Sequence, residues 1–381
     1  MNGSKVKIWK QDPSVESIGV RTAYINTEIN SGPQDKDIVI KGMPLVQGNS
    51  NNDFLFDPVQ NPIEFDAVHT FTVVRKVLTM YRRALNRNNV TQNFDWQWGP
   101  EPISVYPRAG IEANAYYSRG QKSLRFYYFH PGGNERANLV YTCQSFDIVS
   151  HEVGHAVLDS LKPGYWNSWH LQTGGLHESF GDLTTIFTML SQLDQCEAII
   201  AESKGDLHAK SFFPYVAEQF GEALGRSTGL RNADNNLKLS QVSNQVHDIS
   251  RVFTGAVYDI LADIFEDYHK PALYDQAETL LRVGKHMTSL VILALLNGPD
   301  RNATYRDIAN KMIAIEPVPK WKEFISDQFE RREVLGSSLS LTTEQPQALV
   351  WTKCCGSLHH HEHTDGVNKA ISEEQKKQGK S

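Results

Sequence analysis

The chain has 381 residues, of which 40% are hydrophobic and 22% charged, and it carries a formal net charge of −6 at pH 7. This composition is typical of a soluble globular protein, and the length is sufficient for two or three domains. The negative charge and the lack of a basic cluster argue against a nucleic-acid partner, and without a run of eighteen apolar residues the sequence predicts no membrane span.

The N-terminus contains charged residues but no apolar stretch. The sequence therefore predicts no secretory signal and a cytoplasmic location, with secretion by a leaderless route left open. The four cysteines, at positions 143, 196, 354 and 355, match neither a disulfide framework nor a zinc knuckle, which favours a reducing compartment. The sequence does not indicate an oligomeric state.

Residues 1–63 are predicted to form a β-rich segment that is too short to be an independent domain. Alternating apolar residues indicate strands near 6–9, 18–25 and 37–41, separated by clusters of Gly, Pro and Asn. The pattern changes at residue 64, after which apolar residues at helical spacing predict an amphipathic helix over 66–85.

Residues 64–163 are predicted to form an α/β lobe that ends in the helix of a metal motif. Within this lobe, three aromatic-rich runs predict strands, at 103–106, 114–117 and 124–129.

Residues 164–335 are predicted to form a helical lobe. Apolar periodicity indicates its later helices, at 249–269, 272–297, 305–315 and 321–335. From 336 to 381 the polar, low-complexity sequence predicts a disordered tail.

The stretch His151-Glu152-Val153-Gly154-His155 is the strongest functional signal in the chain. On an α-helix, residues four apart lie on one face, so His151 and His155 can present two imidazoles to one metal ion. Glu152 would then lie beside the ion, free to act as a general base. Apolar residues at helical spacing favour that helix, and a following Pro-Gly pair ends it.

The pentapeptide alone also occurs by chance, so a metal site needs further support from the sequence. A third ligand is expected from a second helix. Glu178 follows His155 after 22 intervening residues, and Asp182 lies one helical turn further on. Ligating imidazoles usually donate their other N–H to a carboxylate or a carbonyl. The sequence therefore predicts Glu178 as a metal ligand and Asp182 as a carboxylate that holds a ligating histidine.

The two motifs together resemble those of the thermolysin-like metallopeptidases (gluzincins), over roughly residues 64–330 and most strongly over 147–183. The resemblance implies an α+β fold, namely a two-lobed zincin with a β-rich N-terminal lobe and a helical C-terminal lobe. It implies Zn²⁺ as the cofactor, with the following residues around it: His151, His155 and Glu178 as ligands, Glu152 as the general base, and Asp182 behind His151. His177 stands where the family usually has Asn, and Gly181 where it usually has Ser.

The resemblance also implies a peptide or protein substrate. Residues 114–117, Asn-Ala-Tyr-Tyr, resemble the family's edge-strand motif Asn-Ala-Phe-Trp. An edge strand can take an extended peptide as an added strand. Ala115 is then expected to supply main-chain hydrogen bonds, and Asn114 a side-chain amide, to the substrate.

Three further residues are assigned by the resemblance. Ile148 is expected to line the pocket for the residue after the scissile bond, and Arg231 to bind the substrate's carbonyl, with Arg226 as the second candidate. His247 is implied as a catalytic donor to the oxyanion of the tetrahedral intermediate. The family's acidic partner of this histidine is missing, and Asp248 is a candidate to replace it.

The sequence thus predicts a zinc-dependent metalloendopeptidase in which Glu152 activates water. One alternative is a zinc aminopeptidase of the gluzincin type, for which Glu112 is the candidate to hold the substrate's α-amine. The other alternative is a zincin-like, non-catalytic binding or regulatory protein. Glu152 counts against the latter, because a structural metal site needs no base.

Overall fold

The computed structural model describes residues 3–336, apart from 16, 92–94, 167, 169, 218–220, 222 and 224–230. The described chain is a mixed α+β fold, about 50% helical with small sheets, which confirms the predicted α+β class. The predicted tail after residue 336 and the candidate Arg226 lie outside the described residues.

The largest sheet has four strands in the order β3-β4-β6-β5. Its members are β3 (Ile38–Ile40), β4 (Ile103–Tyr106), β5 (Ala115–Ser118) and β6 (Ser123–Phe126). β4 runs parallel to both β3 and β6, whereas β5 is antiparallel to β6 and forms one edge of the sheet. Because β3 comes from the first 63 residues, that segment contributes a strand to the sheet of the following segment.

Three two-stranded antiparallel sheets complete the β-structure. They pair β1 (Ser4–Trp9) with β2 (Val20–Ile25), β7 (Tyr128–Phe129) with β8 (Val140–Tyr141), and β9 (Tyr215–Val216) with β10 (Arg231–Asn232). The strand predicted over 124–129 is therefore two strands. After Phe126 the chain leaves the pairing with β5, and β7 pairs with β8 instead.

One long helix, α1 (Pro62–Arg87), precedes residue 146, and helices make up most of the described residues after that point. These later helices are α2 (Phe146–Leu161), α3 (Pro163–Trp166), α4 (Leu171–Leu190), α5 (Leu193–Ser203), α7 (Val246–Tyr268), α8 (Gln276–Asn297), α9 (Tyr305–Ile315) and α10 (Pro319–Arg331). Short 3₁₀ turns lie at Pro131–Gly133, Thr142–Gln144 and Leu239–Gln241.

Local capping explains several helix boundaries. The Ser145 side chain accepts a hydrogen bond from the Ile148 N–H and so starts α2. The Asp275 side chain caps α8 in the same way, so this helix begins four residues later than its apolar pattern predicts. Pro62 stands in the first turn of α1, where its missing N–H costs nothing, and the helix begins before the predicted residue 66.

The first 63 residues are joined to β4 by strand pairing and are also held to α1 by ion pairs. Arg75 of α1 donates to Asp35 and Asp37 at 2.7 and 2.8 Å, and Arg82 binds Asp37 through both guanidinium Nη atoms. Although burial alone would raise it, the neighbouring Arg82 and Arg75 hold the pKa of Asp37 at about 2. The positive charges of Arg75 and Arg82 are therefore balanced by Asp35 and Asp37.

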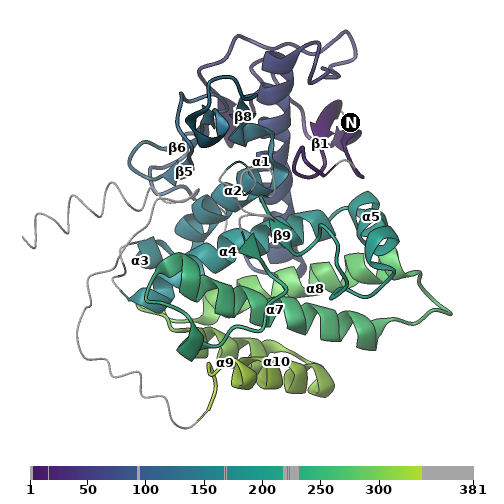
Figure 1. The fold of residues 1–381 in the computed structure, drawn as a ribbon, viewed down its shortest axis with the longest axis vertical. Helices are drawn as coiled ribbons and strands as arrows, with labels where there is room; N and C mark the ends of the chain where they lie inside the picture. Colours follow the sequence, from purple (N-terminus) through teal and green to yellow (C-terminus); the bar gives the residue numbers. More distant parts are fainter. Residues whose placement is uncertain are drawn as a thin grey trace, which may run out of the picture.

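Helices α2 and α4 lie near the middle of the described fold. In Figure 1 the strands β5, β6 and β8 lie above them, and α7, α8, α9 and α10 lie below. α8 is the one described helix whose length and apolar composition would also suit a membrane span, but 61% of its apolar window is buried. It packs against α1, α4, α5, α7 and α9, as the core helix of a globular fold does.

Candidate metal centre

Two histidines of α2 and one glutamate of α4 meet in a buried cluster. Nε2 of His151 lies 3.5 Å from Oε2 of Glu178, and Nε2 of His155 lies 3.7 Å from Oε1 of the same carboxylate. All three side chains are at most 2% exposed. Their one-turn spacing on α2 places both imidazoles on the side that faces α4.

The distances in this cluster suit a shared metal ion better than direct hydrogen bonds. Ligand atoms about 2.1 Å from a tetrahedral ion lie about 3.4 Å from one another. The separations of 3.5 and 3.7 Å between the histidine Nε2 atoms and the Glu178 oxygens are close to that value, and longer than a good hydrogen bond. Two imidazoles and a carboxylate form a donor set that suits zinc and other borderline divalent cations.

The other ring nitrogen of His151 is held by a carboxylate. Its Nδ1 lies 2.9 Å from Oδ1 of Asp182, and Asp182 accepts three hydrogen bonds of 2.8 to 3.0 Å from Arg231. Burial disfavours a charged ring, but the hydrogen bonds to Asp182 and Glu178 raise the pKa of His151 to about 10. Asp182 therefore turns Nε2 of His151 towards Glu178.

A third histidine holds the second ligand. Nδ1 of His155 lies 3.2 Å from Nδ1 of His177, so one of these nitrogens donates to the other. The ring of Trp166 packs edge-on against His177, with the ring centroids 5.9 Å apart. His177 thus holds the His155 ring with Nε2 directed at Glu178, the orientation that a metal ligand needs.

Two glycines allow α2 and α4 to approach this closely. A Cβ on Gly181 would lie 2.5 Å from the His151 ring, and a Cβ on Gly154 would lie 3.0 Å from the Cα of Gly181. Any larger residue at position 181 would push the His151 ring or separate the helices. This explains why glycine, and not the serine of the resembling family, suits this position.

Glu152 lies fully buried beside the cluster. Its Oε2 accepts a hydrogen bond from the Tyr117 N–H at 3.1 Å, while among the described residues its Oε1 has no hydrogen-bond partner. Burial raises the pKa of Glu152 to about 8, against the opposing effect of the nearby His151. A bound divalent cation would favour the ionised carboxylate, because positive charge stabilises it.

Tyr117 docks the edge strand β5 onto α2 at two points. Its N–H reaches Glu152, and its hydroxyl donates to Asp159 at 2.7 Å. Asp159 lies seven residues after Glu152, on the same face of α2, and also pairs with Arg119. Strand β5 is therefore fixed alongside Glu152, next to the cluster of His151, His155 and Glu178.

The residues predicted to contact substrate at this strand lie together. The Asn114 side chain accepts a hydrogen bond from the Ala115 N–H at 2.9 Å and donates one to Glu112 at 3.2 Å. Asn114 is half-buried, Ala115 is buried, and Glu112 is exposed. The Asn114 amide is thus engaged locally in this structure.

His247 reaches the cluster from the first turn of α7. Its Nδ1 lies 2.9 Å from Oε2 of Glu178, and the side chain is 11% exposed. Asp248 points elsewhere, since it accepts from the Ser243 N–H and from Arg251. The carboxylate near His247 is therefore Glu178 and not the expected candidate Asp248.

The other predicted substrate residues are buried. Arg231, on β10, is 8% exposed and directs its guanidinium at Asp182, so it supports the His151 side of the cluster. Ile148 is 2% exposed and packs in the hydrophobic core one turn before His151.

A second group of metal-binding residue types comprises the exposed His208, the half-buried Asp234 and the buried Asp259. Nδ1 of His208 lies 2.9 Å from Asp234, but Asp259 already pairs with Arg332 at 2.6 Å. A cation would compete with that guanidinium for Asp259. This group is therefore a weaker metal site than the buried cluster.

Several contributors to the cluster are not predictable from the motif itself. The roles of the Tyr117 N–H and of Arg231 depend on tertiary packing, and neither residue carries a local signal for them. His177 does carry one, because it directly precedes Glu178 at the position where the resembling family has Asn. No known protein-family model matches the chain, and no curated protein matches it significantly.

Proposed function

We propose that this protein is a two-lobed, thermolysin-like zinc endopeptidase. The observation that supports this most directly is the buried cluster of His151, His155 and Glu178, with the carboxylate of Glu152 beside it. Three ligands with an adjacent carboxylate match a catalytic zinc site, whereas structural zinc sites are usually closed by four ligands.

The residues present fit zinc. His151, His155 and Glu178 would hold it through atoms that already face one another, and Asp182 and His177 hold the two rings in that orientation. When bound, zinc supplies a Lewis acid and makes water more acidic. The one oxygen of Glu152 without a hydrogen-bond partner among the described residues is available to a water molecule.

Glu152 would act as the general base. It takes a proton from the attacking water and passes it to the leaving amine, so it begins and ends the cycle ionised. The Tyr117 N–H holds one carboxylate oxygen and leaves the other for the proton. His247, at the edge of the cluster, would donate to the negative oxygen that develops on the substrate.

Substrate would lie along the edge strand β5. Tyr117 fixes this strand next to Glu152, and an extended peptide added to its outer edge would pass the metal cluster. Such binding holds the chain on both sides of the scissile bond, which favours internal cleavage. Asn114 would have to release Glu112 or the Ala115 N–H to contact the substrate.

An aminopeptidase is the second candidate, and the position of Glu112 favours it. This exposed carboxylate lies 3.2 Å from the Asn114 amide, at the start of the same edge strand. A carboxylate there can hold the free α-amine of a substrate. Endo- and exopeptidase action predict different products from one peptide.

The proposed function is tested by product analysis on the metal-loaded protein. One long peptide is supplied with a free and then with an acetylated N-terminus, and the products are identified by mass spectrometry. We expect internal fragments from both forms and one bound zinc per chain by metal analysis. Stepwise trimming that acetylation abolishes would establish the aminopeptidase, and a protein without bound metal would overturn both.

His177 is expected to control metal affinity through His155. Replacing His177 with Phe removes the contact at His155 Nδ1 and should weaken zinc binding about 10- to 100-fold, whereas His177→Asn can keep a hydrogen bond there. Competition with a chromogenic chelator measures both variants. Equal affinities for the Phe variant and the wild type would show that His155 is held without His177.

A further inference from the structure

A hollow lies away from the buried cluster of His151, His155 and Glu178, between α1, β2, the end of α4 and α8. The space that it encloses is small, about 110 Å³, and is continuous with open solvent, so a ligand held here would lie partly outside the hollow. Ser191 lines the hollow and directly follows α4. It lies thirteen residues after Glu178, which corresponds to about 20 Å along a helix axis. The hollow is therefore separate from the proposed catalytic site.

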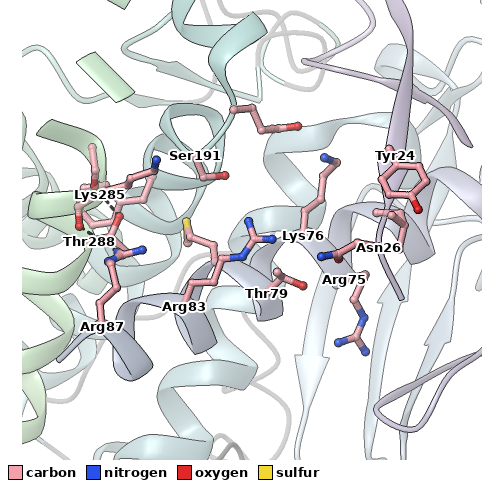
Figure 2. A pocket seen from close by; sticks show the side chains of 15 residues that line it. Tyr24, Asn26, Arg75, Lys76, Thr79, Arg83, Arg87, Ser191, Lys285 and Thr288 are labelled. Carbon is pink, nitrogen blue, oxygen red and sulfur yellow. Dashed lines mark hydrogen bonds between the residues drawn. The ribbon is translucent and has the colours of Figure 1, made fainter. Parts of the chain in front are cut away.

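The hollow is lined by cations and contains no acidic residue in its lining. Lys76, Arg83 and Arg87 lie seven and four residues apart, so they share one face of α1. Lys285 comes from the neighbouring helix α8, whose backbone carbonyl at 285 accepts a hydrogen bond from Arg87. Figure 2 shows these four side chains distributed around the hollow.

Most of this charge has no counterion. Within the described part of the chain, Lys76, Arg83 and Lys285 have no side-chain ion pair, and Arg87 bonds only to a carbonyl and to the Ser289 hydroxyl. Arg75 also lines the hollow but directs its guanidinium away, towards Asp35 and Asp37 (Figure 2).

Asp194, the acidic residue near Lys76, already forms an ion pair with another lysine. Asp194 pairs with the buried Lys10 at 2.8 Å, so it only partly offsets the charge of Lys76. Burial, together with the nearby Lys10 and Arg83, lowers the pKa of Lys76 to about 7. Lys76 is half-buried, whereas Arg83, Arg87 and Lys285 are exposed. Cations clustered around one hollow repel one another in the free protein, and a bound anion would relieve that repulsion.

We propose that this hollow binds a small organic anion that carries at least two phosphoryl or sulfuryl groups. Lys76 and Arg87 are eleven residues apart, about 16 Å along the helix, and this spread of cations favours a ligand with two separated anionic groups over a single tetrahedral anion. The guanidinium groups of Arg83 and Arg87 suit bidentate contacts to such groups. Tyr24, 56% exposed at the rim, offers a ring to the organic part of the ligand.

Fructose 1,6-bisphosphate is a suitable probe, titrated into the full-length, metal-loaded protein by calorimetry at constant ionic strength. We expect saturable binding of one bisphosphate per chain, and weaker binding of inorganic sulfate. In the double variant Lys76→Gln/Arg83→Gln the Kd should rise at least about tenfold. Lys311→Gln, which removes an exposed cation on α9, is the matched control and should bind as the wild type does.

Two further readouts separate binding from folding and from metal loss. Because the double variant removes two repelling cations, its melting temperature without ligand should equal or exceed that of the wild type. Metal content is measured after titration, so that chelation by the bisphosphate is not taken for binding. The proposal is independent of peptidase activity, and Glu152→Gln should bind the probe normally.

Three results would overturn the proposal. The first is the absence of saturable binding by both probes, and the second is an unchanged Kd in the double variant. The third is tighter binding of a single-stranded oligonucleotide that the same double substitution abolishes. That outcome would replace the small-molecule site with a nucleic-acid surface.

Discussion

Replacing Glu152 with Gln is expected to lower kcat for peptide hydrolysis about 10²- to 10⁴-fold, while one zinc ion stays bound. The amide keeps the size of the side chain and can still accept the Tyr117 N–H, but it cannot take a proton from water. The three residues that would hold the metal are unchanged. Peptide assays together with metal analysis measure both effects on one preparation.

Asp159→Asn is the matched control for this variant. Asp159 is a second buried carboxylate on the same face of α2, and it also holds Tyr117, but through the hydroxyl. We expect this variant to lose stability, because Arg119 loses the negative charge of its ion-pair partner, with a much smaller effect on kcat. If both variants lost activity equally, Glu152 would act by docking β5 and not as a base.

The clustering of His151, His155 and Glu178 was the most predictable part of the candidate site, because its signals are local. The one-turn spacing of His151 and His155, and that of Glu178 and Asp182, directly set which side chains share a helix face. What the spacing could not provide is the contact between the two helices. That depends on Gly154 and Gly181, whose role is visible only where α2 meets α4.

Strands and helix ends were less predictable for a physical reason. Periodicity indicates that a segment is a strand but not its partner, and β3 joins β4 across more than sixty intervening residues. Helix boundaries follow capping, so α9 has the predicted bounds whereas α8 begins only after its cap, Asp275.

The basic residues around the hollow are a further case in which the sequence does not show which segments come together. The sequence contains no basic cluster, yet Lys76, Arg83 and Arg87 form a stripe that reads as the solvated face of an amphipathic helix. Only packing brings Lys285 opposite this stripe, from about two hundred residues further along the chain. The spacing of the three α1 residues is visible in the sequence, whereas the contribution of Lys285 is not.

His247 is a comparable case, since its motif indicated a histidine at the site but not its partner. Nδ1 of this ring lies 2.9 Å from Glu178, so His247 touches a residue that would hold the metal. Two roles follow from that position. His247 holds Glu178 in place, or it uses its other nitrogen, Nε2, to stabilise negative charge on the substrate.

His247→Asn is expected to separate these roles. The Asn amide nitrogen occupies nearly the place of Nδ1, so it can still donate to Glu178, but nothing replaces Nε2. We expect kcat to fall about 10²- to 10³-fold with little change in KM, because a donor to a developing oxyanion acts mainly in the transition state. Zinc affinity, measured by chelator competition, should stay near that of the wild type, whereas His247→Ala should lower both zinc affinity and kcat. If His247→Asn kept the wild-type kcat, the contact with Glu178 would be the whole role of this histidine, and the oxyanion donor would have to be sought elsewhere.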